Sequence, residues 1–301
     1  MINCLIKYIL SIPKPSGTFY PAFLAKLTEY NILTSELYLA NLHTILYVAG
    51  FYELIFIASD KLLYPILHKL KKINKDAIKE SRNQINMHSV SFIQSLIILQ
   101  CCFNAIFQDG DKYWPFSGFQ FENSAERVFG YSEKNEIVCI FAIGYFMWDI
   151  LISILYSTFP FVIHGLISFT VYSIGSKPYI NYYASIFLFF ELSNPFLNIR
   201  WFALKYELGR ISKFWRFLVD ANDLLFMVTF FLCRIVWGLA QICILCYDFY
   251  IVKDDPRFLI YETMFICLGN FVLDGLNLMW FGTMIKIAFS KLLKNKSVKK
   301  D

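Results

Sequence analysis

Apolar runs long enough to cross a lipid bilayer constrain the fold of this chain more than any other feature. A membrane-spanning helix needs ~20 mostly apolar residues, and several such runs follow one another in the 301 residues. Hydrophobic residues make up 57% of the chain and charged residues only 17%, whereas soluble domains carry about 25% charged residues. Backbone polar groups in lipid need internal partners, which favours helices. We therefore predict an all-α polytopic membrane protein.

Seven spans can be drawn, of which the fourth is short and the fifth contains a proline. They are Leu37–Ser59, Asn86–Gln108, Ile137–Ser157, Pro160–Gly175, Tyr179–Ile199, Asp220–Tyr247 and Phe258–Ile285. Lysine and arginine gather in alternate connections, namely Asp60–Ile85, Arg200–Arg216 and the tail Lys286–Asp301. By the positive-inside rule these segments face the cytosol. We expect a luminal N-terminus and a cytosolic C-terminus.

Glu191 is an unexpected carboxylate, because it follows the apolar run Tyr182–Phe190. An acid at the middle of a bilayer costs ~2.5–3.5 kcal/mol on insertion scales and usually faces a bundle interior or a cavity. Pro195 adds a second irregularity, since proline lacks a backbone donor and disfavours helical geometry at the preceding Asn194. Irregular backbone at this depth needs a cavity or a protein shield. Together these features predict a polar cavity beside a broken helix.

Other ionisable residues lie at a similar depth in neighbouring spans. At ~1.5 Å per residue, Asp149 and Glu191 are roughly 12–13 Å from the cytosolic ends of their spans, and His164 is roughly 6 Å from its own. We predict a lipid cavity open toward the cytosol. Its predicted lining residues are Asp149, His164, Glu191, Ser193, Asn194, Arg234, His88 and Asp274.

Structural alternatives remain open for several of these residues. Arg234 could serve to neutralise an acid such as Glu191, and His88 and Asp274 could be interhelical hydrogen-bonding groups. Cys243 and Cys246 form a CxxC motif, but it lies inside an apolar run without a partner pair. Packing explains it better than metal or redox chemistry. We expect no metal, no cofactor and no nucleic-acid partner, and membrane lipids as the main partners.

Several blocks resemble the TLC superfamily of membrane proteins (TRAM, Lag and CLN). They are Gly144–Asp149, the run around His164, Glu191–Trp201, Phe230–Ile235 and Leu276–Phe281. The Glu-Leu-Ser-x-Pro-Phe-Leu-Asn-x-Arg block resembles the TLC-domain-containing branch. The resemblance implies six helices in a barrel around a cavity, preceded by one extra helix. It also implies residence in the endoplasmic reticulum or a neighbouring endomembrane, and a role in lipid metabolism or homeostasis.

The resemblance divides the chain into four parts. Residues 1–36 are expected to be a luminal segment, and residues 37–78 a first transmembrane helix with a basic cytosolic loop. Residues 79–293 are expected to form the TLC domain, followed by a basic cytosolic tail at residues 294–301.

The resemblance to ceramide synthases within this superfamily is incomplete. Those enzymes carry paired histidines followed by a His-Asp and a further Asp, which support N-acylation of a sphingoid base. Here Gly165 follows His164, and Glu191, Ser193 and Asn194 stand where the downstream acids would be expected. The leading interpretation is therefore a lipid-handling or lipid-sensing protein that is not an enzyme. The alternative is an N- or O-acyltransferase that uses acyl-CoA, with His164 as general base.

A receptor or transporter is disfavoured. Transporter folds often place broken helices at corresponding positions of two repeated halves. Only one such break is evident in this sequence.

Overall fold

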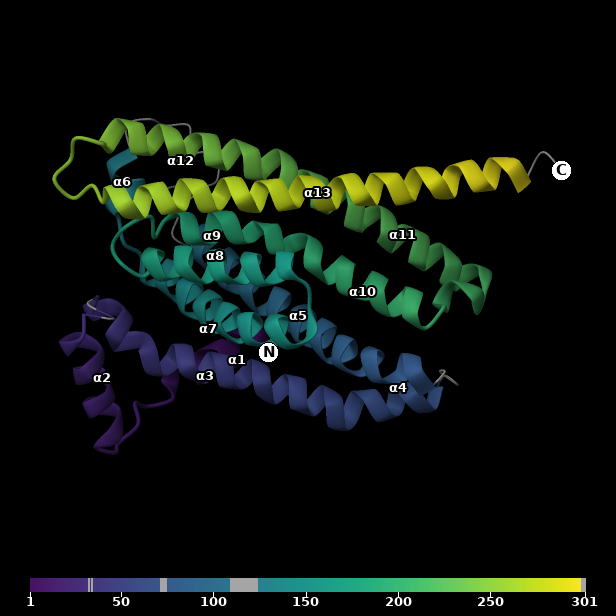
Figure 1. Ribbon diagram of the computed structural model, residues 1–301, viewed down its shortest axis with the longest axis horizontal. Coiled ribbons are helices and arrows are strands. Elements are labelled where there is room, and N and C mark those ends of the chain that lie inside the picture. Colours follow the sequence, from purple (N-terminus) through teal and green to yellow (C-terminus); the bar gives the residue numbers. More distant parts are fainter. Residues whose placement is uncertain (32, 34, 71–74, 109–123, 299–301) are drawn as a thin grey trace.

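The structure is a bundle of helices (Figure 1). The computed structural model describes residues 1–31, 33, 35–70, 75–108 and 124–298, and these residues form helices and no strand. Five stretches are long and apolar enough to cross a membrane: Glu36–His68, Arg82–Phe107, Glu133–Tyr156, Lys213–Val252 and Ile260–Ser290. The all-α polytopic membrane fold predicted from the sequence is confirmed.

These five stretches contain the main helices of the bundle. They are α3 (Glu36–Ala58) with the π-helix η1 (Ser59–Leu63) and α4 (Tyr64–Leu70); α5 (Lys75–Gln108); α7 (Glu133–Tyr156); α11 (Lys213–Phe230) with the π-helix η7 (Phe231–Trp237) and α12 (Gly238–Val252); and α13 (Ile260–Val298). Shorter elements are α1 (Ile2–Ser11), α2 (Phe19–Glu29), α6 (Ser124–Phe129) and the 3-10 helix η6 (Leu208–Arg210).

The two spans that looked weakest in the sequence are also the least regular in the structure. The fourth is α8 (Phe159–Gly175), an apolar helix of only 17 residues. The fifth folds as three pieces: α9 (Tyr183–Leu188), the 3-10 helix η5 (Phe189–Ser193) and α10 (Asn194–Lys205). A total of seven spans therefore stays a prediction.

The helix irregularity lies before Pro195 rather than at it. Asn194 has helical dihedrals (φ −69°, ψ −35°) and is the first residue of α10. The expectation that proline would break the helix at Asn194 is wrong. Proline is tolerated in the first turn of a helix, because the N–H groups there have no intrahelical partner to lose. The tighter 3-10 turn instead falls on the segment that carries Glu191.

The bundle has two distinct ends (Figure 1). We call one the basic end; it holds α4, the turn between α10 and α11 and the last part of α13, with Lys61, Arg200, Lys205, Arg210 and Lys213. The opposite end holds α2, α6 and the turn between α12 and α13. The side chains of residues 69–81 and 291–301, which include the predicted basic tail, lie outside the described part.

Helix α7 forms the centre of the core. It packs against α3, α5 and α8, and every residue from Val138 to Phe146 is buried. Gly144 permits close approach to α3, since a Cβ there would lie 2.6 Å from Val48 Cγ1. The short α8 packs along this buried helix, which places the polar residues of α8 beside α7.

Candidate functional site

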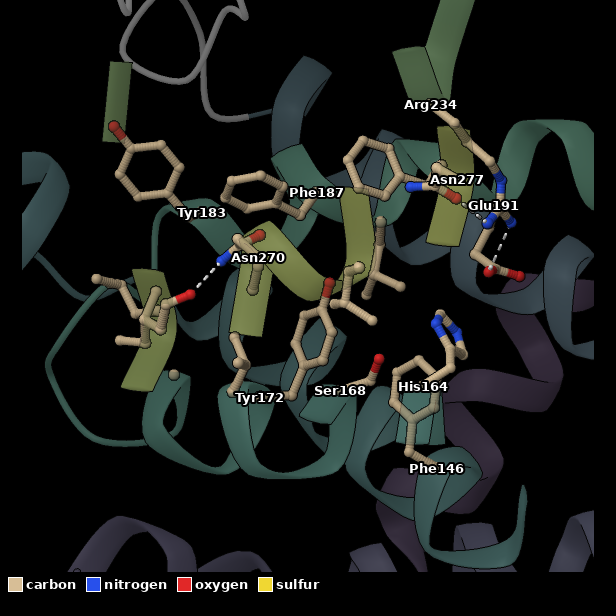
Figure 2. A pocket seen from close by; sticks show the side chains of 18 residues that line it. Phe146, His164, Ser168, Tyr172, Tyr183, Phe187, Glu191, Arg234, Asn270 and Asn277 are labelled. Carbon is tan, nitrogen blue, oxygen red and sulfur yellow. Dashed lines mark hydrogen bonds and ion pairs between the residues drawn. The ribbon is translucent and has the colours of Figure 1, made fainter. Parts of the chain in front are cut away.

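Within the described part of the chain, two neighbouring cavities of the bundle share four lining residues. The outer chamber has a volume of about 950 Å³, lies among α5, α7, α8, α10, α11 and α13, and reaches Arg200, Asp220 and Asp223 at the basic end. The inner cavity is much smaller, about 50 Å³, and extends toward Tyr183 and Ile266 (Figure 2). Both are lined by Phe146, His164, Glu191 and Arg234, a set that we call the junction.

Arg234 is the most heavily hydrogen-bonded member of the junction. It lies in η7, the wide π-turn between α11 and α12, and π-turns inside helices are frequent at functional sites. Its Nε donates to Ser193 Oγ (3.0 Å), Nη1 to Asn277 Oδ1 (3.2 Å) and Nη2 to Asn194 Oδ1 (2.9 Å). The guanidinium is thus fixed by neutral acceptors from η5, α10 and α13.

Glu191 faces this guanidinium without a direct hydrogen bond to it. The nearest approach, Arg234 Nη2 to Glu191 Oε1, is 3.7 Å, whereas charge-assisted N–H···O bonds are ~2.7–2.9 Å long. The other carboxylate oxygen accepts from Asn194 Nδ2 at 2.6 Å. Both side chains are more than nine-tenths buried. Burying charge is costly unless hydrogen bonds compensate, and here Asn194 serves both partners.

His164 stands between the two cavities. Its ring lies edge-on to Phe146 (5.9 Å between centroids) and to Trp280 (6.1 Å). Within the described part of the chain, no hydrogen bond is made by either ring nitrogen. The imidazole is therefore positioned by aromatic packing and lines both cavities. Figure 2 shows it in the wall of the inner cavity.

Asp149 lines the outer chamber on the neighbouring helix. Ser153 lies one turn further along α7 and lines the same chamber. A Cβ at position 165 would lie 3.3 Å from Asp149 Oδ2 and 3.0 Å from Ile150 Cγ1. Gly165 thus leaves the space that Asp149 occupies. A second histidine at position 165 would therefore crowd Asp149 and Ile150.

His88 belongs to a separate network on the wall of the outer chamber. Its Nδ1 donates to Asn198 Oδ1 at 2.7 Å, and Asn198 Nδ2 reaches Ser91 Oγ at 3.1 Å. The ring stacks on Trp201 with centroids 4.3 Å apart. Because an amide oxygen can only accept, Nδ1 carries the hydrogen and a neutral His88 keeps Nε2 as an acceptor.

Most of the lining residues predicted from the sequence reach the outer chamber. These are His88, Asp149, His164, Glu191, Asn194 and Arg234. Ser193 and Asp274 line neither of these two cavities, and their assignment to the lipid site stays a prediction. The Ser193 hydroxyl oxygen accepts a hydrogen bond from Arg234 Nε. Asp274 lies at the edge of the inward face of α13, with Oδ1 3.6 Å from where a Cβ at Gly238 would be, and therefore faces α12.

Several polar residues of the inner cavity were not predicted from the sequence. Ser168 and Tyr172 follow His164 at intervals of four residues, which places all three on one face of α8. Asn270 and Asn277 on α13 line the same cavity. The four-residue spacing on α8 could have indicated these residues, but the pattern did not stand out because serine and tyrosine are common in this chain.

The site combines apolar walls with a few polar groups at one end. Among the residues that the structure describes, no three His, Cys, Asp or Glu side chains converge in a way that could hold a metal ion. A cavity of this type suits an amphiphile, whose polar group would lie at the junction and whose apolar part would lie along the chamber.

Comparison with known proteins places the chain in a family. A model of the TLC domain matches residues 84–286. An uncharacterized TLC domain-containing protein of Saccharomyces cerevisiae is 43% identical, with 97% of each chain covered. Topoisomerase I damage affected protein 4 of the same yeast is 29% identical over 87% of this chain and 88% of its own.

Human TLC domain-containing protein 4 is also similar. It is 32% identical over 56% of this chain and 64% of its own length. No solved structure matches. The chain therefore belongs to the TLC domain family.

Proposed function

We propose that this protein binds a membrane lipid in the outer chamber and thereby handles or senses that lipid. In this role it contributes to membrane lipid homeostasis in the endoplasmic reticulum or a neighbouring endomembrane. The observation that carries the proposal is the chamber of about 950 Å³ with its polar junction. Ligand pockets measure ~300–1,000 Å³ and are mostly apolar with a few placed polar groups. Membership of a family linked to lipid-related membrane proteins supports the same function.

The charges of the junction favour a headgroup that donates hydrogen bonds. Three of the five N–H groups of Arg234 already donate to Ser193, Asn194 and Asn277. Asp149 and Glu191 supply acceptor oxygens to the chamber. A lipid with hydroxyl or amine groups at its polar end matches this set better than one whose headgroup only accepts.

Lipid co-purification tests the proposal directly. The protein would be isolated in mild detergent and its bound lipid identified and counted by mass spectrometry. Met227 of α11 lines the chamber, whereas its neighbour Val228 is 44% exposed and lines neither cavity. Met227→Trp should fill the chamber and reduce lipid recovery, while Val228→Trp should leave it unchanged. Equal recovery from both variants would argue against the chamber as the lipid site.

A cellular measurement tests the wider role. Deletion of the gene should change the lipid profile of the endomembranes, and re-expression of the wild-type protein should restore it. An unchanged profile across growth conditions would argue against a part in lipid homeostasis.

An acyl-CoA-dependent acyltransferase is the second candidate, favoured by the position of His164 at the junction. A general base must be within hydrogen-bond reach of the proton that it abstracts, and His164 faces the chamber without a side-chain partner in the described residues. Purified protein with labelled acyl-CoA and amine or alcohol acceptors should then form product, and His164→Ala should abolish it. Full product formation by this variant would exclude the proposed role.

A further inference from the structure

The inner cavity differs in kind from the outer chamber. Its volume of about 50 Å³ is well below the ~150 Å³ of an apolar cavity that binds benzene. It therefore has no room for a lipid chain. A water molecule takes ~30 Å³ in the liquid, so the cavity has the size of about two waters.

Two hydroxyl groups in the wall of this cavity have no hydrogen-bond partner among the described residues. Figure 2 shows the hydroxyl groups of Ser168 and Tyr172 pointing into it. Ser168 is 3% exposed and Tyr172 9% exposed, and within the described part of the chain neither hydroxyl makes a hydrogen bond. Buried polar groups are hydrogen-bonded to protein or ordered water in the large majority of cases.

Two more partners lie on the opposite wall. Asn277 uses its Oδ1 to accept from Arg234 and keeps its amide N–H₂. Asn270 donates to the Ile266 carbonyl and keeps its Oδ1. A buried water needs about two to four polar partners. The walls formed by α8 and α13 provide that number.

We infer that the inner cavity is a water-binding site, in which ordered water bridges the Ser168 and Tyr172 hydroxyls to the amides of α13 and solvates the Glu191–Arg234 pair. The 3.7 Å separation of that pair agrees with this assignment, since water at the junction supplies the hydrogen bonds that the direct pair does not make. The water lies on the side of the junction away from the outer chamber. It would keep the charges hydrated while a lipid fills the chamber.

Radiolytic labelling tests the site without requiring a lipid ligand. Brief X-ray irradiation converts bound water into hydroxyl radicals, which oxidise adjacent side chains even when these are buried. Tyr172 should be oxidised roughly threefold or more faster than Tyr182, because only Tyr172 contacts a cavity with room for water. Tyr182 is the matched control, since it is 5% exposed and lines neither cavity.

Two variants sharpen the test. Ser168→Val fills the cavity with methyl groups and should lower Tyr172 oxidation to the Tyr182 rate. Ser168→Ala removes one water partner without filling the space and should give an intermediate rate. An unchanged Tyr182 rate in each variant shows that the fold is intact. The inference is overturned if wild-type Tyr172 is oxidised no faster than Tyr182, or if Ser168→Val leaves the Tyr172 rate unchanged.

Discussion

Among the residues that the structure describes, two arginine–acid pairs are buried, and they are built in opposite ways. Arg127 of α6 donates from Nε and Nη2 to the two oxygens of Asp248 on α12, each at 2.6 Å. Ser124 and Tyr183 complete that carboxylate at 2.8 and 2.5 Å. At the junction, by contrast, Arg234 and Glu191 approach only to 3.7 Å, and the guanidinium is held by neutral side chains.

The difference in bonding suggests different roles: Arg127–Asp248 stabilises the fold, and Arg234–Glu191 belongs to the candidate site. The Arg127–Asp248 pair is bidentate and lines neither cavity, so it closes the opposite end of the bundle around α6, α9 and α12. The Arg234–Glu191 pair faces both cavities and leaves acceptor capacity toward them. A buried ion pair is by itself weak evidence of function. We propose the Arg234–Glu191 pair as part of a site because its members do not bond directly and face the cavities.

Breaking the Arg127–Asp248 pair, which we call the closed pair, should produce the largest loss of stability. Arg127→Ala leaves Asp248 buried and uncompensated, which typically costs ~3–5 kcal/mol. Thermal unfolding in detergent should show a large drop in Tm. Arg257→Ala, at an exposed arginine beside Asp255, is the control and should change little. The double variant Arg127→Met/Asp248→Leu should recover part of the loss, and a single variant as stable as the control would disprove the structural role.

Neutralising one member of the Arg234–Glu191 pair, which we call the open pair, should reduce stability less than Arg127→Ala does and should reduce lipid binding more. Glu191→Gln keeps an oxygen for Asn194, and Arg234 keeps its three neutral acceptors, so we expect a loss of about 1–2 kcal/mol. Lipid recovered with the protein should fall severalfold. A Tm drop larger than that of Arg127→Ala would remove the distinction between the two pairs.

Crowding the wall of the junction should have a smaller effect. Gly165→Ala pushes a methyl group against Asp149 and Ile150. Overpacking costs ~1–3 kcal/mol, and the gain in helix propensity returns ~1 kcal/mol, so a net loss of about 1 kcal/mol is expected. Gly275→Ala is the matched control, because a Cβ there meets nothing within 4 Å. It should be neutral or stabilising in the same unfolding assay.

The exposed pair in the turn after α12 should matter least. Hydrogen bonds from Arg257 lower the pKa of Asp255 from 3.8 to about 2. Because the folded-state pKa is depressed, any contribution is present above about pH 4 and is lost as the pH falls toward 2. The Tm difference between wild type and Asp255→Asn should be small at pH 7 and vanish near pH 2. A difference that grows on acidification would contradict this sign.

The sequence predicted the open pair better than the closed one. Glu191 and Arg234 stood out because each interrupts an apolar run. Arg127 and Asp248 fell in predicted connections beyond the span ends, where charges are ordinarily solvated. No local pattern indicates that α6 folds back onto α12, since this contact joins residues about 120 positions apart.

The helical architecture followed from apolar length, but finer geometry did not. The 3-10 turn at Glu191 and the π-turn at Arg234 depend on packing between segments distant in the sequence. The position of Asp274 outside both cavities could not be predicted for a related reason. Span depth alone does not say which face of a helix turns inward.

The π-turn at Phe231–Trp237 divides the long helix Lys213–Val252 into two parts that are rotated relative to each other about the helix axis. Each residue of an α-helix turns the chain by about 100°, so a widened turn offsets one half of the helix from the other. The α12 half is fixed by Asp248, while the α11 half forms chamber wall through Leu224, Met227 and Phe230. Substitutions that reshape the wall can therefore accumulate on α11 without disturbing the locked end. The chamber wall and the locked end of this long helix are therefore separated at Arg234.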